Sequence, residues 1–173
     1  MNTMKLISVS IILILFGCIN LRHDVSNDEK AWFPYSTKNV YVTREAIFLI
    51  KVDSGLEPER LALVPPSDSK RGSGFYSSPK SIQDYNENPN EACRSNLGEE
   101  FRINVIGIVE IGTEFIPVKV KRNSGWNIWF GNHTYDTRYG KIVSGQYKGT
   151  IVDIEDVSWC MEEGPILNRY IEI

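Results

Sequence analysis

The feature that most constrains the fold is an alternation of apolar and polar side chains over residues 101–121. Its apolar members are Phe101, Ile103, Val105, Ile106 and Ile108. Alternation with a period of two places the apolar side chains on one face of a strand. The phase changes close to Gly107, which indicates a β-bulge, and Gly112-Thr113 is typical of a turn. The segment therefore predicts a long hairpin.

Strand patterns of the same kind recur along the chain, with no sustained helical periodicity after the N-terminal segment. They cover residues 38–43, 46–52, 61–64, 126–130, 146–154 and 166–173. The composition, 42% hydrophobic and 24% charged, is not that of a disordered, collagen-like or coiled-coil chain. Several short strands between turn residues predict an all-β fold, either a small barrel or a sandwich.

A short apolar run occupies residues 6–16, directly after Lys5. At a rise of 1.5 Å per residue, this run reaches about 16 Å, roughly half of the ~30 Å hydrocarbon core of a membrane. A stable transmembrane span is therefore not expected. A positive start, a short apolar run and a small residue near its end predict a cleaved export signal helix over residues 1–17.

The end of this run, Leu15-Phe16-Gly17-Cys18, resembles the lipobox of bacterial lipoproteins. The resemblance implies that the chain is cut before Cys18 and that the Cys18 thiol carries a diacylglycerol. Two or more acyl chains hold a protein stably on a membrane. In that family an Asp after the cysteine retains the protein at the inner membrane, so Ile19 suggests the outer membrane, facing the periplasm. One alternative is a plain secretory signal in which Cys18 is incidental, and the other is an internal core helix.

After the signal, a tether and one domain are expected. Residues 19–30 are mostly polar and predict a flexible lipidated tether over residues 18–37, followed by a single mainly-β domain over residues 38–173. In an oxidising compartment Cys93 and Cys160 form an even pair, which predicts a disulfide bond. Two independent buried thiols are the alternative.

Residues 65–98 differ from the rest of the expected domain. They are rich in Ser, Pro, Asn and Gly, and they are long for a connection inside a compact domain. One helical turn is expected over residues 81–85. The segment is either a binding loop or a tolerated insertion.

Aromatic side chains gather in one later stretch, at Trp126, Trp129, Phe130, Tyr135 and Tyr139. Strand alternation places Trp126 and Phe130 on one face and Trp129 on the other, so one face must meet solvent, another layer or a partner. Aromatic side chains are favoured at interfaces, and the cluster therefore predicts a binding surface. The alternative is that these side chains fill the core. Three flanking cations could face an anionic partner, namely Arg122, Arg138 and Lys141.

No catalytic or metal-binding pattern is recognisable in the sequence. His23 and His133 lack metal-ligand spacing, and no Gly-x-Ser-x-Gly motif accompanies His133 and Asp136 as in a hydrolase triad. Asp153 and Glu155 are expected on one solvated strand face rather than as a catalytic pair. The net charge of −3 argues against nucleic-acid binding. We therefore expect no cofactor, no metal and no nucleic-acid partner.

Parts of residues 112–157 are similar to small SH3-like barrels of exported bacterial proteins. The similarity rests on Gly112-Thr113, Val118-Lys119-Val120, Trp126-Asn127-Ile128-Trp129 and Gly149-Thr150-Ile151-Val152. In that class aromatic grooves often bind peptides or cell-wall glycopeptide. The similarity therefore implies an SH3-like barrel with a binding role.

These features together favour a membrane-anchored, periplasm-facing lipoprotein that binds an envelope protein or a cell-wall ligand without catalysis. One alternative is an immunity lipoprotein that neutralises a periplasm-acting toxin, with residues 65–98 as the plug and Tyr85 among its contacts. A second alternative is an envelope hydrolase that uses Asp153 and Glu155.

Overall fold

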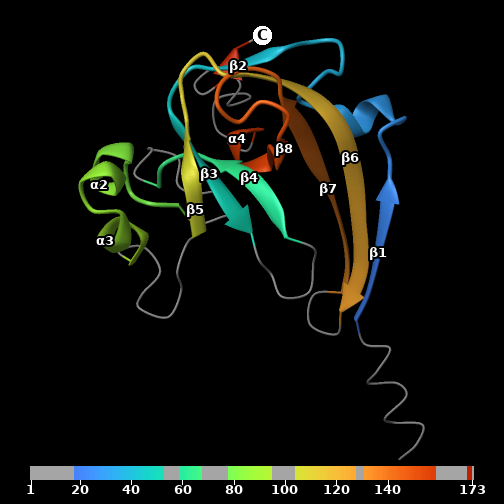
Figure 1. The fold of residues 1–173 in the computed structure, drawn as a ribbon. Coiled ribbons are helices and arrows are strands. Elements are labelled where there is room, and N and C mark those ends of the chain that lie inside the picture. The colour runs from blue at the N-terminus through green and yellow to red at the C-terminus, as the bar shows by residue number, and fades with distance from the viewer. Residues whose placement is uncertain are drawn as a thin grey trace, which may run out of the picture.

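The structure, a computed structural model, describes residues 18–52, 59–67, 78–94, 104–127, 131–158 and 171–172. Strands predominate among these residues and the helices are short (Figure 1), which confirms the all-β fold class. No described helix is long and apolar enough to cross a membrane. The SH3-like type of barrel stays a prediction.

One sheet contains all the described strands. The strands are β1 (Cys18–Asp24), β2 (Tyr41–Thr43), β3 (Ile47–Val52), β4 (Arg60–Val64), β5 (Asn104–Val109), β6 (Glu114–Asn127), β7 (Gly131–Ile142), β8 (Ile151–Asp153) and β9 (Ile171–Glu172). The helices are η1 (Glu29–Trp32), α2 (Ile82–Glu87), α3 (Pro89–Arg94) and α4 (Glu155–Ser158). The strand order is β5-β3-β4-β8-β7-β6-β2-β9, with β1 paired to β6. The β4–β8 pair is parallel and the other described pairs are antiparallel.

The expected strands over residues 46–52 and 61–64 are present as β3 and β4, whereas the strand expected over residues 38–43 is reduced to β2, which begins at Tyr41. The strand expected over residues 146–154 is reduced to β8, because turns with positive φ at Gly145 and Gly149 precede it. Residues 128–130 and 166–170, where further strand was expected, lie outside the described residues.

The prediction that residues 101–121 form one long hairpin is wrong, because its two strands do not pair with each other. β5 pairs with β3, whereas β6 pairs with β2 and β7. The turn at Gly112, with φ of 82°, is present, but it is a corner between two parts of the sheet. Thr43 holds this corner, because its backbone N donates to the Thr113 carbonyl at 2.9 Å and its Oγ1 to the Glu110 carbonyl at 2.6 Å.

The bulge expected near Gly107 is confirmed. Leu49 pairs with Gly107 and Ile50 with Val105, so Ile106 is the extra residue on β5. The Tyr147 hydroxyl lies where a Cβ at residue 107 would stand. Glycine is therefore required here by the close approach of Tyr147, which packs against the core of the sheet.

The flexible tether expected over residues 18–37 differs from the structure. β1 pairs with β6 along its whole length, from Cys18 opposite Asn127 to Asp24 opposite Lys121. Figure 1 shows β1 beside the long, curved β6 and β7. Polar side chains are compatible with a strand at a sheet edge, where one side of the backbone faces solvent. The polar composition of this stretch therefore reflects an edge strand.

The 3₁₀ helix η1 also belongs to the fold. Ala31 and Trp32 are buried against Val120 of β6, and the Trp32 indole N–H donates to the Ser26 carbonyl at 2.8 Å. Tyr35 is buried in the main core, where its hydroxyl donates to the Ile154 carbonyl at 2.9 Å. Burial of large aromatic surface thus fixes the chain between β1 and β2.

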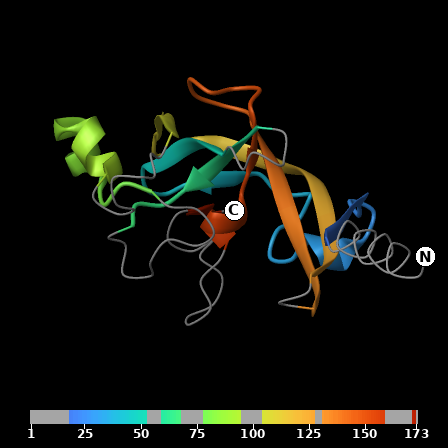
Figure 2. The ribbon, with the colours of Figure 1, turned by 90° about the horizontal axis from the view of Figure 1, so that it is seen from below.

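Two apolar clusters cover the two faces of β3 and β4. The main core includes Tyr41, Ile47, Leu49, Leu63, Phe115, Ile142, Val152 and Ile154. On the other face, Phe48 and Ile50 pack with side chains of α2. Ser81 accepts a hydrogen bond from Asp84 N at 3.0 Å and caps α2, which confirms the helical turn expected there. Figures 1 and 2 place α2 and α3 at the opposite end of the molecule from β1.

Candidate functional site

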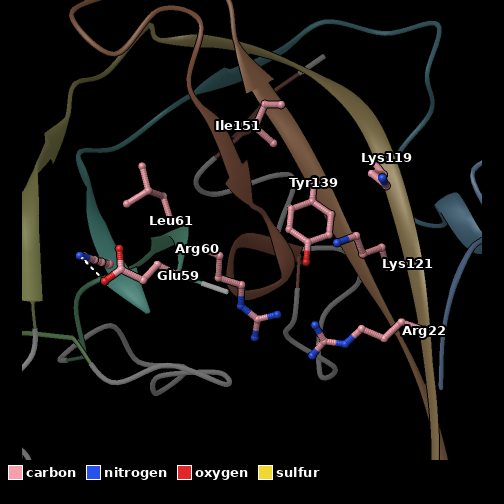
Figure 3. Close-up of a pocket in the computed structure, with 9 residues that line it drawn as sticks. Arg22, Glu59, Arg60, Leu61, Lys119, Lys121, Tyr139 and Ile151 are labelled. Carbon is pink, nitrogen blue, oxygen red and sulfur yellow. Dashed lines mark ion pairs between the residues drawn. The ribbon is translucent and has the colours of Figure 1, made fainter. Parts of the chain in front are cut away.

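A cationic pocket with a volume of about 530 Å³ is the candidate site (Figure 3). Its lining consists of Arg22, Lys51, Glu59, Arg60, Leu61, Lys119, Lys121, Tyr139 and Ile151. Five of these side chains are cationic and one is acidic, although the whole chain carries a net charge of −3. A concave site lined by charge of one sign concentrates ligands of the opposite sign.

Strand geometry explains why so many cations meet here. Lys119 and Lys121 lie two residues apart on β6 and project from the face opposite Val120, which is buried against η1. Lys119 pairs with Tyr139 of β7. β1 runs beside β6 and supplies Arg22, and β4 begins with Arg60 on the other side of the pocket. Sequence positions far apart are therefore brought to one surface.

The polar ends of four side chains point toward one shared space. Figure 3 shows this convergence for the guanidinium groups of Arg22 and Arg60, the ammonium group of Lys121 and the hydroxyl of Tyr139. The Lys121 Nζ lies 5.5 Å from the centroid of the Tyr139 ring, within the range of a cation–π interaction. Burial, followed by the charges of Lys119, Arg22 and Arg60, lowers the pKa of Lys121. A bound anion would relieve this repulsion.

Carboxylates hold the outer cations of the pocket in place. Lys51 pairs with Glu59 at 2.6 Å, and Lys119 pairs with Asp24 at 3.3 Å. The side chain and backbone N–H of Ser26 hydrogen-bond to Asp24, and these bonds together with Lys119 lower the pKa of Asp24 to about 2. Asp24 is therefore ionised across the neutral pH range, and it offsets part of the charge of Lys119.

A buried carboxylate, that of Asp153, lies beside Arg60 of the pocket. The Arg60 Nε lies 3.8 Å from Asp153 Oδ2, and Asp153 is fully buried. Asp153 also pairs across the sheet with Tyr139, whose pKa is raised by burial. Asp153 therefore positions Arg60 and Tyr139 before a ligand binds. This reduces the conformational entropy that the two side chains lose on binding.

The expectation that Asp153 and Glu155 lie on a solvated face is wrong. Both are buried, as is Asp156. Arg138 compensates Glu155, because its Nη1 lies 3.0 Å from Oε1 and its backbone N donates to the same oxygen at 2.7 Å. The Arg138 Nε also donates to the Ala31 carbonyl at 2.7 Å, so the group joins η1 to β7. Buried charges need compensation of this kind. The spacing of Asp153 and Glu155 in the sequence does not reveal that Arg138 provides it.

The Glu155 carboxyl has a raised pKa. Burial, followed by the charge of Asp153, raises its pKa to about 7, against the opposing effect of Arg138. Raised carboxyl pKa values also occur in acid–base catalysis. Neither Glu155 nor Asp153 lines the pocket, and the envelope-hydrolase alternative stays a prediction.

Of the expected aromatic surface, the structure describes the side chains of Tyr135 and Tyr139, both on β7. Tyr139 lines the pocket, whereas Tyr135 is exposed on β7 and stacks on His133. For Trp126 the structure describes the backbone, which pairs with Ile19 and Asn132. Trp129 and Phe130 lie outside the described residues.

Tyr85, the contact expected in the immunity alternative, lies away from the pocket. Its ring packs edge-on against Phe48 with centroids 5.4 Å apart, and burial raises its pKa. The helices α2 and α3, which belong to the segment expected to be an insertion, cover this part of the sheet. Residues 68–77 and 95–98 of that segment lie outside the described residues.

The flanking cations expected to face an anionic partner are engaged within the chain. Arg122 donates two hydrogen bonds of 2.8 Å to Asp136, and Arg138 binds Glu155. Lys141 is exposed and does not line the pocket. The pocket cations were missed by sequence reasoning, although Lys119 and Lys121, two apart on an expected strand, were one available signal.

The structure describes two of the three cysteines, Cys18 and Cys93. Cys93 of α3 has a free thiol, and burial raises its pKa. Cys160 lies outside the described residues, so the structure does not show the expected disulfide bond. Cys18 is the first residue of β1, and its lipidation stays a prediction.

Among the described residues, no group of three or more His, Cys, Asp or Glu side chains is placed to hold a metal ion. No protein-family model matches this chain, and neither a curated protein nor a solved structure is significantly similar to it.

Proposed function

We propose that this protein is a non-catalytic envelope lipoprotein that binds an anionic ligand in the cationic pocket. The observation that carries the proposal is the convergence of Arg22, Arg60 and Lys121 on the Tyr139 hydroxyl in an acidic chain. The expected ligand is an anionic component of the envelope, such as an envelope protein or cell-wall material, and the protein faces the periplasm from the outer membrane. The lipobox-like Leu15-Phe16-Gly17-Cys18 supports the anchor and the compartment.

The position of Cys18 supports a link between the anchor and the pocket. Cys18 and Arg22 lie on the same strand, four residues apart. At about 3.3 Å per residue, their Cα atoms are separated by about 13 Å. A lipid on Cys18 would therefore hold the pocket close to the membrane surface, where envelope ligands are concentrated.

Charge reversal in the pocket tests the proposal. The probes are poly-L-glutamate and purified cell-wall sacculi, and binding is measured by co-sedimentation and calorimetry. We expect the native protein to bind at least one probe, with an affinity that falls as salt rises, because ions screen exposed charges. Arg22→Glu and Lys121→Glu should each weaken binding by roughly tenfold or more, a free-energy change of about 1.4 kcal/mol.

The matched control is Lys148→Glu, which reverses an exposed lysine in a turn outside the pocket. It makes the same change in net charge, so an effect of overall charge alone would appear equally in the control. Equal weakening by the control and the pocket variants would contradict the proposal, as would an absence of binding to every anionic probe, the phosphates named below included.

A further inference from the structure

We infer that the anionic group bound in the pocket is a phosphoryl group whose organic substituent packs on Leu61 and Ile151. This inference rests on the proposed function and names the chemistry of its ligand. It is argued from the donors that converge in the pocket, from the pocket charge and from the shape of the walls.

The donors suit an anion with three acceptor oxygens. Arg22 and Arg60 contribute planar guanidinium groups, Lys121 adds an ammonium group, and Tyr139 adds a hydroxyl that is also hydrogen-bonded with Arg60. Guanidinium forks match both carboxylate and phosphate. A carboxylate has two oxygens, whereas a terminal phosphoryl group has three and offers each donor an acceptor at short range. Four donors directed toward one space therefore favour the phosphoryl group.

The charges that face the pocket also favour a compact anion of high charge. A phosphate monoester carries about −1.5 to −2 at pH 7. Glu59 and Asp24 offset Lys51 and Lys119 at the rim, and Asp153 lies beneath Arg60. Lys121 lies among cations, with its pKa lowered by burial and by those neighbours. Positive charge therefore gathers around Lys121 and Tyr139, where a single multivalent group would lie.

The size of the pocket indicates a ligand larger than free phosphate. A volume of about 530 Å³ lies in the range of sites for small organic molecules. Leu61 and Ile151 form an apolar part of the lining, and Ile151 is 56% exposed. An organic substituent on the phosphoryl group would cover this apolar surface. Two sources supply such a ligand: the headgroup of phosphatidic acid, which is a phosphate monoester, and a soluble phosphate monoester.

The experiment uses the full-length protein in neutral detergent and compares three soluble probes by calorimetry at constant ionic strength. They are glycerol 1-phosphate, short-chain phosphatidic acid below its micelle concentration, and glutarate as the dicarboxylate. We expect one of the phosphate probes to bind at least roughly tenfold more tightly than glutarate. Tighter binding of glycerol 1-phosphate identifies a soluble ester as the source, and tighter binding of phosphatidic acid identifies a lipid headgroup.

Two conservative variants test the geometry. Arg60→Lys keeps the charge but removes the fork, and Tyr139→Phe keeps the ring but removes the hydroxyl. Each should weaken the phosphate probe several-fold while leaving glutarate binding less affected. Because Arg60 also pairs with buried Asp153, the melting temperature of both variants is measured, and Tyr139→Phe provides the test if Arg60→Lys is unstable. Lys148→Gln is the control with unchanged binding.

The outcomes separate this inference from the proposed function. Equal or tighter binding of glutarate or poly-L-glutamate would overturn the phosphoryl inference and leave an anion-binding pocket that takes an acidic peptide. Loss of phosphate binding in Lys148→Gln would place the phosphate outside the pocket and overturn the inference. Unchanged phosphate binding in both Arg60→Lys and Tyr139→Phe would have the same consequence. If the phosphates, the carboxylates and sacculi all fail to bind, the inference and the proposed function fail together.

Discussion

Glu155 shows how much a single residue depends on its surroundings. Two acidic residues two apart in a polar stretch are ordinarily solvated, yet Asp153 and Glu155 are buried. Arg138 offsets part of the desolvation cost of burying Glu155, because it donates hydrogen bonds to the Glu155 carboxylate from its backbone N and its guanidinium group. Desolvation disfavours the ionised carboxylate and raises the Glu155 pKa.

This raised pKa predicts how stability changes with pH. The Glu155 carboxyl has a pKa of about 7 in the folded chain, against 4.5 for an ordinary glutamate. Between these values the folded state keeps a proton that the unfolded state has released, so the free energy of unfolding falls as pH rises through this range. The contribution of Glu155 to this fall is about 3 kcal/mol by the top of the range. Urea denaturation at a series of pH values measures it.

Glu155→Gln should flatten this dependence, because the amide does not titrate. Glu114→Gln changes an exposed carboxyl and serves as the control. If Glu155→Gln kept the native slope between pH 5 and pH 7, burial of Glu155 would not be the source of the pH dependence.

At the scale of elements, the corner between β5 and β6 decides the pairing of the sheet. Local alternation predicts the two strands and their turn, but a hairpin and a corner have the same local sequence signals. Thr43 resolves the choice, because its hydrogen bonds to Glu110 and Thr113 tie the corner to β2. β5 thereby pairs edge to edge with β3, where buried Val109 lies opposite Ile47.

Gly107 gives a test at this scale. A Cβ at residue 107 would overlap the Tyr147 hydroxyl, so Gly107→Ala should destabilise the fold by about 1 to 3 kcal/mol. Removing the hydroxyl relieves most of the overlap, and the cost of Gly107→Ala should be smaller in a Tyr147→Phe background. Denaturant unfolding of the four proteins gives the coupling energy. A strictly additive double variant would show that Tyr147 does not approach Gly107 in solution.

For the whole molecule, the cationic pocket is assembled from segments that are distant in sequence. Arg22 comes from β1, Arg60 from β4 and Lys121 from β6. β1 carries Arg22 into this position because it pairs with β6 from its first residue, Cys18. The proposed anchor and the proposed binding site are therefore parts of one rigid strand rather than of a tether and a separate domain.

The anchor itself has a direct test. The native protein should partition into the detergent phase, and mass spectrometry should find an N-terminal peptide that begins at acylated Cys18, because two or more acyl chains give stable membrane attachment. Cys18→Ser should move the protein to the aqueous phase. Cys93→Ser removes a different thiol and should remain in the detergent phase. A native protein that begins at Met1, or that stays in the aqueous phase, would contradict the lipoprotein proposal.

The sequence by itself determined the features that depend on neighbours in the chain. Alternation predicted β3 and β4, glycine indicated the bulge at Gly107, and Ser81 began a helical turn as expected, because side-chain period, backbone freedom and capping act within a few residues. Only the tertiary structure decided the partner of β5, the burial of Glu155 and the convergence of cations on Tyr139. These features depend on contacts between residues far apart in the chain. A local sequence pattern does not predict the free energy of those contacts.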